Sequence, residues 1–339
     1  MTAEMTVPRG CFDPTPQFQL GLSENPFSPL PSVLAALHEV MAHANRYPEF
    51  LPDRLPRVIA QRIGAHPDQL IVGAGATGVA MQTLQAVLGD GDRARFVFAS
   101  PTFDGYPIMA SMLGAEPVAV PLDGQGYQDL QAMADAVDAN TAVVVVCRPH
   151  NPTGTLCTAD DLDSFLESVR SDVVVVLDEA YVEFVRAADT VDILELIGRF
   201  PNLMVLRTFS KAFGLAGLRI GYAVGDVELM RRIRRWQLPF GVNSTAVAAV
   251  TASYAAEDEL RRRVARIGVE REWLRNALIH GGIEVPESHA NFLYLEGPDI
   301  AAALEDAGIV VKAYPDGSAR VAVGDPAAGR AVVDVLLPR

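Results

Sequence analysis

One lysine is surrounded by residues that could do chemistry with it. Lys211 ends the segment 207–211 (RTFSK), and Arg219 follows eight residues later. A lysine ε-amine can form a Schiff base with a carbonyl group, most often that of pyridoxal 5'-phosphate (PLP). Thr208, Ser210 and Arg219 can donate hydrogen bonds to the phosphate, and Arg219 also supplies positive charge. The segment therefore predicts a PLP site, the alternative being an ordinary solvated lysine.

A glycine-rich run at 73–78 (GAGATG) follows an expected strand and opens an expected helix. It matches the G-x-G-x-x-G dinucleotide fingerprint, which also needs an acidic residue about 20 positions on. That acid is missing, because the next strand ends in FASP at 98–101. Free amides and the positive end of the helix dipole still favour an anion. We therefore expect a phosphate cradle with the Ala76 and Thr77 amides as donors; a structural glycine turn is the alternative.

An aspartate follows the apolar run 173–177 (VVVVL), which reads as a buried strand. A carboxylate at the end of such a strand is costly unless it is paired. Asp178 beside a pyridine nitrogen would keep that nitrogen protonated and make the ring an electron sink. Tyr181, three residues on, could hydrogen-bond the phenolic oxygen of the ring. The alternative is a buried aspartate that caps the next helix.

Two further segments end expected strands with residues that suit an aromatic cofactor. Asn151 opens the turn 151–154 (NPTG), where proline restricts φ and glycine relieves strain. Its side chain could donate to the same phenolic oxygen. Phe103, in the segment 101–103 (PTF), could stack on the ring. A simple turn and ordinary core packing are the alternatives.

The elements that must position these residues alternate between strands and helices. Apolar runs predict strands at 69–72, 95–99, 117–120, 142–147, 173–177, 203–206 and 220–224. Helical patterns lie between them at 80–88, 103–112 and 159–170. This alternation is typical of an α/β domain with a mostly parallel sheet.

The pattern changes after about residue 230. A charged helical stretch at 257–280 is followed by short strands at 290–295 and 318–323, which indicates a smaller α+β domain. The proline-rich opening, with prolines at 8, 14, 16, 26, 29 and 31, should lie over another surface rather than form helix. We expect an arm at 1–30 packing with the small domain, a large PLP-binding domain at 31–235 and the small domain at 236–339.

Composition narrows the class of protein. The formal net charge of −14 over 339 residues argues against a nucleic-acid or anionic-membrane surface. No apolar run approaches the ~20 residues that span a bilayer, and the first ten residues lack a secretory core. Cys11, Cys147 and Cys157 form neither a disulfide framework nor a metal-ligand cluster. We expect a cytoplasmic protein without a metal.

Taken in order, these segments resemble the fold-type I PLP-dependent aminotransferases, in particular the histidinol-phosphate and aromatic aminotransferase branch. The resemblance runs from 22–26 (LSENP) to Arg320. It is carried mainly by 45–48 (NRYP), 151–154 (NPTG), 178–181 (DEAY) and 208–219. It implies a large domain with a seven-stranded, mostly parallel sheet covered by helices, and a small α+β domain.

The resemblance also implies a role for each matching residue. Lys211 would carry the cofactor and then move a proton at the substrate α-carbon. Asp178 would pair with the pyridine nitrogen, and Tyr181 and Asn151 with the phenolic oxygen. Phe103 would stack on the ring. The phosphate would be held by Ala76, Thr77, Thr208, Ser210 and Arg219.

Other matching residues imply the substrate contacts and the assembly. Tyr47 would reach the phosphate of the neighbouring subunit, which implies a homodimer with shared sites. Arg320, in the expected late strand, would bind the anionic group of the substrate; a surface strand residue is the alternative. Asn25, Asn291 and Lys312 would lie near the substrate.

Two departures bear on which substrate is used. Lys312 stands where histidinol-phosphate enzymes usually carry arginine, and Ala74 where they tend to carry a polar residue. Losing one charge-assisted hydrogen bond costs about 1.5–3 kcal/mol. The segment 205–211 with Pro239 and Phe240 resembles actinobacterial aromatic aminotransferases. We therefore expect transfer from phenylalanine or tyrosine to a 2-oxo acid such as 2-oxoglutarate.

Other functions stay open at this point. Histidinol-phosphate aminotransfer is the first alternative. A PLP-dependent decarboxylase of the threonine-phosphate type would share every cofactor residue. A dinucleotide-binding oxidoreductase would leave Lys211 and Asp178 unexplained. A non-catalytic binding protein would not need Lys211, Asp178 and Arg219 together.

Overall fold

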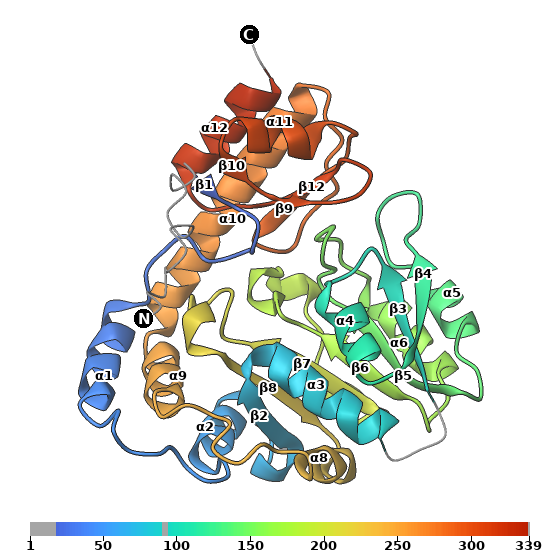
Figure 1. Cartoon of the computed structure of the whole chain (residues 1–339), viewed down its shortest axis with the longest axis vertical. Helices are drawn as coiled ribbons and strands as arrows, with labels where there is room; N and C mark the ends of the chain where they lie inside the picture. The colour runs from blue at the N-terminus through green and yellow to red at the C-terminus, as the bar shows by residue number, and fades with distance from the viewer. Residues whose placement is uncertain (1–17, 90–93, 338–339) are drawn as a thin grey trace, which may run out of the picture.

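A seven-stranded sheet forms the centre of the larger part of the chain in the computed structural model, which describes residues 18–89 and 94–337. The strands lie in the order β2-β8-β7-β6-β5-β3-β4 (Figure 1). β8 is antiparallel to both of its neighbours, and the other pairs are parallel. Their bounds are β2 Leu70–Ala74, β3 Arg95–Ser100, β4 Glu116–Pro121, β5 Thr141–Cys147, β6 Val174–Asp178, β7 Leu203–Thr208 and β8 Ile220–Gly225. The predicted mostly parallel sheet is confirmed.

Both faces of this sheet are buried under helices. Along β7, Leu203 and Val205 enter one hydrophobic core while Met204 and Leu206 enter the other, as the two-residue period of a strand requires. The helices that pack into the first core include α2 Arg54–Ile63, α5 Leu130–Asp135, α6 Ala159–Ser168, α7 Ile193–Arg199 and α9 Ala246–Ala255. Those of the second core are α3 Gly75–Leu88, α4 Gly105–Met112 and α8 Val227–Arg234.

The register of the strands brings the predicted chemistry to one edge. Cys147 at the end of β5 lies opposite Asp178 at the end of β6, and Asp178 lies opposite Leu206 near the end of β7. The carboxyl ends of parallel strands share an edge, which is where open α/β sheets bind ligands. α3 begins at Gly75, five residues before the expected start, so its first turn also lies at this edge.

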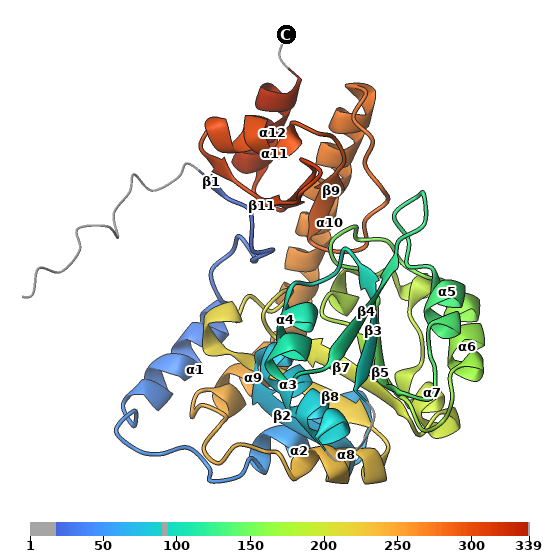
Figure 2. The same cartoon turned by 45° about the vertical axis from the view of Figure 1, so that its right-hand side comes forward.

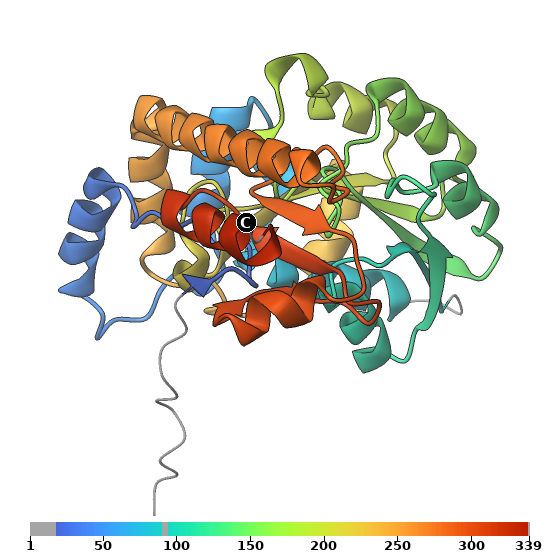
Figure 3. The same ribbon diagram turned by 90° about the horizontal axis from the view of Figure 1, so that it is seen from above.

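The smaller part is built on a three-stranded antiparallel sheet in the order β11-β12-β9. These strands are β9 Phe292–Leu295, β11 Lys312–Ala313 and β12 Ala319–Ala322. The helices are α10 Glu257–His280, α11 Ile300–Asp306 and α12 Pro326–Leu336. Figure 1 shows α10 running from α9 into the smaller part, and Figure 3 shows α10 and α12 side by side over it. The expected α+β unit is confirmed.

The amino-terminal segment joins the smaller part before it enters the larger one. β1 Phe18–Gln19 pairs in parallel with β10 Ile309–Val310. Figure 2 shows β1 beside the smaller part. α1 Pro31–Met41 then packs against α9, with Pro31 at the first helical position, where its missing N–H costs nothing. The prolines at 8, 14 and 16, which we expected in an arm over another surface, lie outside the residues that the structure describes, and so does Cys11. None of the described helices is long and apolar enough to cross a membrane.

Candidate active site

A cavity of about 470 Å³ lies where the carboxyl edge of the large sheet faces the smaller part. Most of the predicted site residues line it. They are Ala76, Thr77, Phe103, Asn151, Asp178, Tyr181, Thr208, Ser210, Lys211, Arg219, Lys312 and Arg320. The sequence holds only two lysines, Lys211 and Lys312, and both are in this wall.

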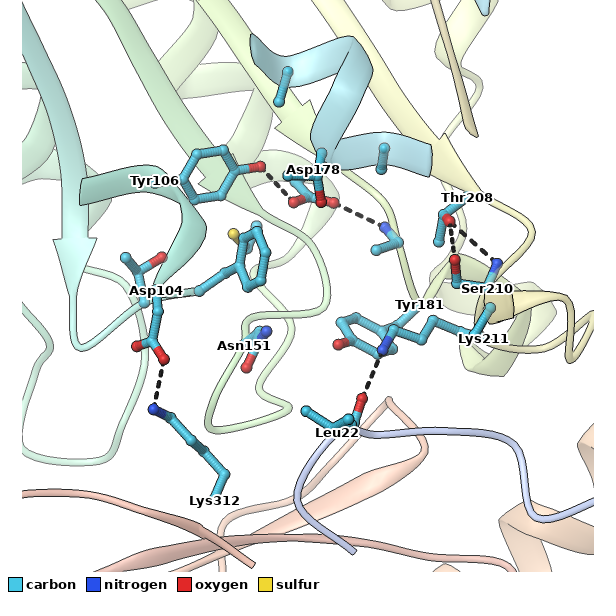
Figure 4. Close-up of a pocket in the computed structure, with 18 of the residues that line it drawn as sticks. Leu22, Asp104, Tyr106, Asn151, Asp178, Tyr181, Thr208, Ser210, Lys211 and Lys312 are labelled. Atoms are coloured by element: carbon cyan, nitrogen blue, oxygen red, sulfur yellow. Dashed lines mark hydrogen bonds and ion pairs between the residues drawn. The ribbon is translucent and has the colours of Figure 1, made fainter. Parts of the chain in front are cut away.

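The Lys211 amine points into the cavity and contacts the amino-terminal segment. Its Nζ donates to the carbonyl oxygens of Leu22 at 3.0 Å and Ser23 at 3.2 Å (Figure 4). Burial, and then the positive charge of Arg320, lower the pKa of this amine to about 8. Near neutral pH an appreciable fraction of Lys211 is therefore uncharged and nucleophilic.

Asp178 is buried at the end of β6 and accepts two hydrogen bonds. The Ala180 amide donates to Oδ1 at 3.0 Å, and the Tyr106 hydroxyl donates to Oδ2 at 2.5 Å (Figure 4). Burial raises the pKa of Asp178, and the Tyr106 hydrogen bond opposes that rise. Sequence reasoning missed Tyr106; the available signal was its place one helical turn after Phe103, on a helix expected at this edge.

The phosphate donors predicted from the sequence come together at one end of the cavity. The Thr208 and Ser210 hydroxyl oxygens are 3.0 Å apart, and Arg219 Nη1 lies 3.5 Å from the Ser210 hydroxyl. The Ala76 and Thr77 amides belong to the first turn of α3, where N–H groups have no helical acceptor. A Cβ on Gly75, whose φ is +74°, would collide with the Arg219 guanidinium. Glycine at 75 therefore keeps this cradle open for an anion.

Arg320 also lines the cavity, and its side chain is buried. Nη1 donates to Asn151 Oδ1 at 2.5 Å, and Nη2 donates to the Gly21 carbonyl at 2.7 Å. Nε is buried without a hydrogen-bond partner, so the group has unused donor capacity beside the cavity. Such a donor is an anchor for a carboxylate.

The outer wall is aromatic and carries one ion pair. Lys312 Nζ lies 2.5 Å from Asp104 Oδ2 and 5.6 Å from the centre of the Tyr314 ring. Phe103 packs edge-on against Tyr106 with ring centres 5.6 Å apart. Leu22 and Tyr314 also line this region, and neither was predicted.

Two predicted substrate residues do not line the cavity. The Asn25 amide donates to the carbonyl oxygens of Lys211 at 3.2 Å and Ala212 at 2.9 Å. The fully buried Asn291 amide donates to the carbonyl oxygen of Ser23 at 3.0 Å. The side-chain NH2 groups of both residues donate to backbone carbonyls, which ties the segments around Lys211 and Ser23 in place.

Tyr47 also lies away from the cavity of its own chain. It is 83% exposed, and its ring stacks on that of Phe240 with centres 4.9 Å apart. Its predicted contact with a phosphate would therefore need a second subunit.

Comparisons with known proteins agree with this geometry. A family model for class I and II aminotransferases matches residues 15–336. An aromatic amino acid aminotransferase of Streptomyces avermitilis is 42% identical over 312 residues, which cover 91% of this chain and 86% of the relative. An aromatic amino acid aminotransferase of Cutibacterium acnes is 41% identical over 94% of this chain and 91% of the relative.

A solved structure is similar along nearly its whole length. The histidinol-phosphate aminotransferase of Sinorhizobium meliloti, in complex with PLP, has a TM-score of 0.86 and 26% identity. The match covers 95% of this chain and 90% of that chain. The chain belongs to the class I and II aminotransferase family. It is a PLP-dependent aminotransferase, so the dinucleotide interpretation of 73–78 is wrong.

The residues present fit PLP. The open cradle beside Gly75 suits its phosphate, and the buried Asp178 suits its pyridine nitrogen. Lys211 lies in the same cavity with an amine of lowered pKa. Phe103 offers a ring face, and Asn151 and Tyr181 offer polar groups for the phenolic oxygen.

Proposed function

We propose that this enzyme moves the amino group of an aromatic amino acid, phenylalanine or tyrosine, to a 2-oxo acid such as 2-oxoglutarate. The observation that carries the proposal is the apolar and aromatic lining that Leu22, Phe103 and Tyr314 give to the cavity that also holds Arg320. Aromatic side chains bind best in such apolar, ring-lined space. The names of the curated relatives, at 41–43% identity, support the same substrate class.

Arg320 would hold the carboxylate of either substrate. A guanidinium binds a carboxylate through two parallel hydrogen bonds, which sets its orientation as well as its position. The bond between Arg320 and Asn151 fixes the guanidinium at the inner wall. The amino acid would then present its α-carbon toward Lys211 and its side chain toward the outer wall.

Lys211 and Asp178 would divide the proton and charge chemistry. When bound, PLP supplies an electron sink for the pair released at the substrate α-carbon. The Lys211 amine would take the proton from that carbon and deliver it to the cofactor, so that the amino group stays with the cofactor when the oxo acid leaves. Asp178 would keep a negative charge opposite the pyridine nitrogen, and Tyr106 stabilises that charge by its hydrogen bond.

Histidinol-phosphate aminotransfer is the second candidate. It is favoured by the name of the Sinorhizobium meliloti structure and by the positive charge of Lys312 in the outer wall. A phosphate on the substrate would need that charge. A decarboxylase of the threonine-phosphate type would use the same cofactor residues but release carbon dioxide.

The proposal includes a homodimer in which Tyr47 completes the partner's site. Tyr47 lies among exposed apolar side chains: Phe50 is 60% exposed, Leu238 69% and Phe240 42%. A contiguous apolar surface of this kind is typical of an interface between proteins. If a second copy buries this surface, Tyr47 would lie at the interface between the subunits. Its hydroxyl would then be directed toward the cavity of the second copy.

The test is a comparison of kcat/KM for the PLP-loaded enzyme. L-phenylalanine, L-tyrosine, histidinol phosphate and O-phospho-L-threonine are supplied with 2-oxoglutarate, and glutamate and carbon dioxide are both measured. We expect glutamate formation to be fastest with the two aromatic amino acids. A preference for histidinol phosphate, or release of carbon dioxide, would refute the proposal.

A further inference from the structure

The Asp104–Lys312 pair joins the two parts of the chain across the outer cavity. Asp104 immediately precedes α4 in the larger part, and Lys312 begins β11 in the smaller part. Figure 4 shows both side chains pointing toward one another at the cavity wall, with 2.5 Å between Oδ2 and Nζ. The cation of the outer wall is therefore already paired with a carboxylate.

The direction of the Asp104 side chain is not explained by its helix. Asp104 is the N-cap residue of α4, a position where an aspartate usually accepts a backbone N–H of the first turn. Asp192 and Asp226 have extended backbones and do so at the starts of α7 and α8. Asp104, like Asp53 before α2, has a right-handed helical backbone and makes no such bond. Its carboxylate is therefore available to Lys312.

Asp104 compensates the positive charge of Lys312 at the outer wall. Glu24 also lines the cavity and adds a carboxylate to it. The guanidinium groups of Arg320 and Arg219 hydrogen-bond to the uncharged Asn151 and Ser210. A phosphate monoester that approaches Lys312 would therefore meet the Asp104 carboxylate and a cation that is already paired. An uncharged phenyl or phenol ring would meet no such opposition.

We infer that Asp104 is a specificity-determining residue, which neutralises Lys312 and thereby selects uncharged aromatic side chains against substrates that carry a phosphate. The inference rests on the proposed function and gives a physical reason why the enzyme would prefer aromatic amino acids. Asp104 acts on the distal end of the substrate and takes no part in the proton transfers at Lys211.

The experiment measures a ratio in Asp104→Asn, which keeps the size of the side chain and removes its charge. The ratio is kcat/KM for histidinol phosphate divided by kcat/KM for phenylalanine. We expect it to rise by about 10-fold or more, because a phosphate gains a free cation and loses a nearby like charge. In the double variant with Lys312→Gln the rise should disappear, since the freed cation is then absent. Asp226→Asn, at a helix start outside the cavity wall, is the matched control and should leave the ratio unchanged.

A second readout does not depend on turnover. 3-Phenylpropionate and 3-phosphonopropionate both carry a carboxylate for Arg320 and differ in their distal group. Asp104→Asn should lower the inhibition constant of the phosphonate relative to that of the phenyl compound. The shift should shrink when ionic strength is raised from about 0.05 M to about 0.3 M, because the groups are partly exposed.

The outcomes separate this inference from the proposed function. If the unmodified enzyme prefers phenylalanine and Asp104→Asn leaves both ratios unchanged, the role of Asp104 is overturned and the proposed function stands. If the unmodified enzyme prefers histidinol phosphate, the proposed function fails and the inference fails with it. A rise that persists in the double variant would also overturn the inference, since Lys312 would then not be the group that Asp104 neutralises.

Discussion

The Tyr106 hydroxyl donates a 2.5 Å hydrogen bond to Oδ2 of Asp178, and both side chains are buried. The bond joins the first turn of α4 to the end of β6, two elements that are 72 residues apart in the chain. A hydrogen bond to a carboxylate favours its charged form. Tyr106 therefore helps Asp178 to stay ionised in a place where burial opposes ionisation.

Tyr106→Phe should raise the pKa of Asp178 further. We propose that an ionised Asp178 pairs with the protonated pyridine nitrogen, so as the pH is lowered PLP affinity should begin to fall at a higher pH in this variant. We expect affinity below that of the unmodified protein at acidic pH, and little difference at alkaline pH, where Asp178 is ionised in both proteins. Fluorescence titration of the cofactor-free protein measures this. Asp178→Asn has no carboxyl group to titrate, so its PLP affinity should not show this fall with pH. If PLP affinity depends on pH in the same way in Tyr106→Phe and in the unmodified protein, the role of Tyr106 is contradicted.

Covalent capture of PLP by the cofactor-free protein should follow the ionisation of Lys211. The neutral amine is the nucleophile, so the rate should rise with pH and level off above the pKa of about 8. An unperturbed lysine would continue to gain reactivity up to about pH 10.4. Borohydride reduction followed by peptide mass spectrometry locates the label. We expect it on Lys211 and not on Lys312, and Lys211→Ala should remove it.

Arg320 should be needed for its shape as well as its charge. Arg320→Lys keeps the charge but loses the paired donors, so kcat/KM for phenylalanine should fall by about 100-fold, mostly through KM. Arg320→Met should fall at least as far. The two variants differ in a second measurement: because the Arg320 charge lowers the pKa of Lys211, only Arg320→Met should move the PLP-capture profile to higher pH. Unchanged KM in Arg320→Lys would remove Arg320 from the substrate site.

Tyr47 should act in the neighbouring subunit. Tyr47→Ala and Lys211→Ala homodimers should each be defective when assayed at limiting PLP. A heterodimer of one subunit of each kind, isolated with two affinity tags, contains one site with native Lys211 and the partner's native tyrosine. Its activity should be about half that of the unmodified dimer, since one of two equivalent sites is complete. A heterodimer as inactive as the Lys211→Ala homodimer would show that Tyr47 does not act across subunits.

The buried pair of Arg207 and Glu179 should contribute to stability. Arg207 Nη2 lies 2.7 Å from Glu179 Oε2, and the Glu179 side chain is 1% exposed. Arg207→Met should lower the free energy of unfolding by about 3–5 kcal/mol, because it leaves a buried charge unpaired. Urea unfolding of the PLP-loaded protein measures this loss, and Arg207→Met/Glu179→Leu should recover part of it.

Much of the site could be predicted because each motif follows a buried strand. Asn151, Asp178 and Thr208 come at or after the ends of apolar runs, and in a mostly parallel sheet such ends converge on one edge. The glycine run could be placed there for the same reason, although the start of α3 at Gly75 lay outside the expected helix. The local sequence pattern was sufficient to predict a site residue wherever that residue's place in the site depends on its position along a single strand or helix.

The sequence by itself determined the α/β architecture and predicted which lysine would bind the cofactor and which residues would hold its phosphate, because strand period and motif spacing are local. Only the tertiary structure decided which polar side chains meet a ligand. Asn25 and Asn291 are directed to backbone carbonyls 186 and 268 residues away in the chain, while Tyr106 and Asp104 are directed to Asp178 and Lys312. A side chain's partner depends on what the fold brings within about 3 Å, and long-range contacts of that kind leave no pattern in a single sequence.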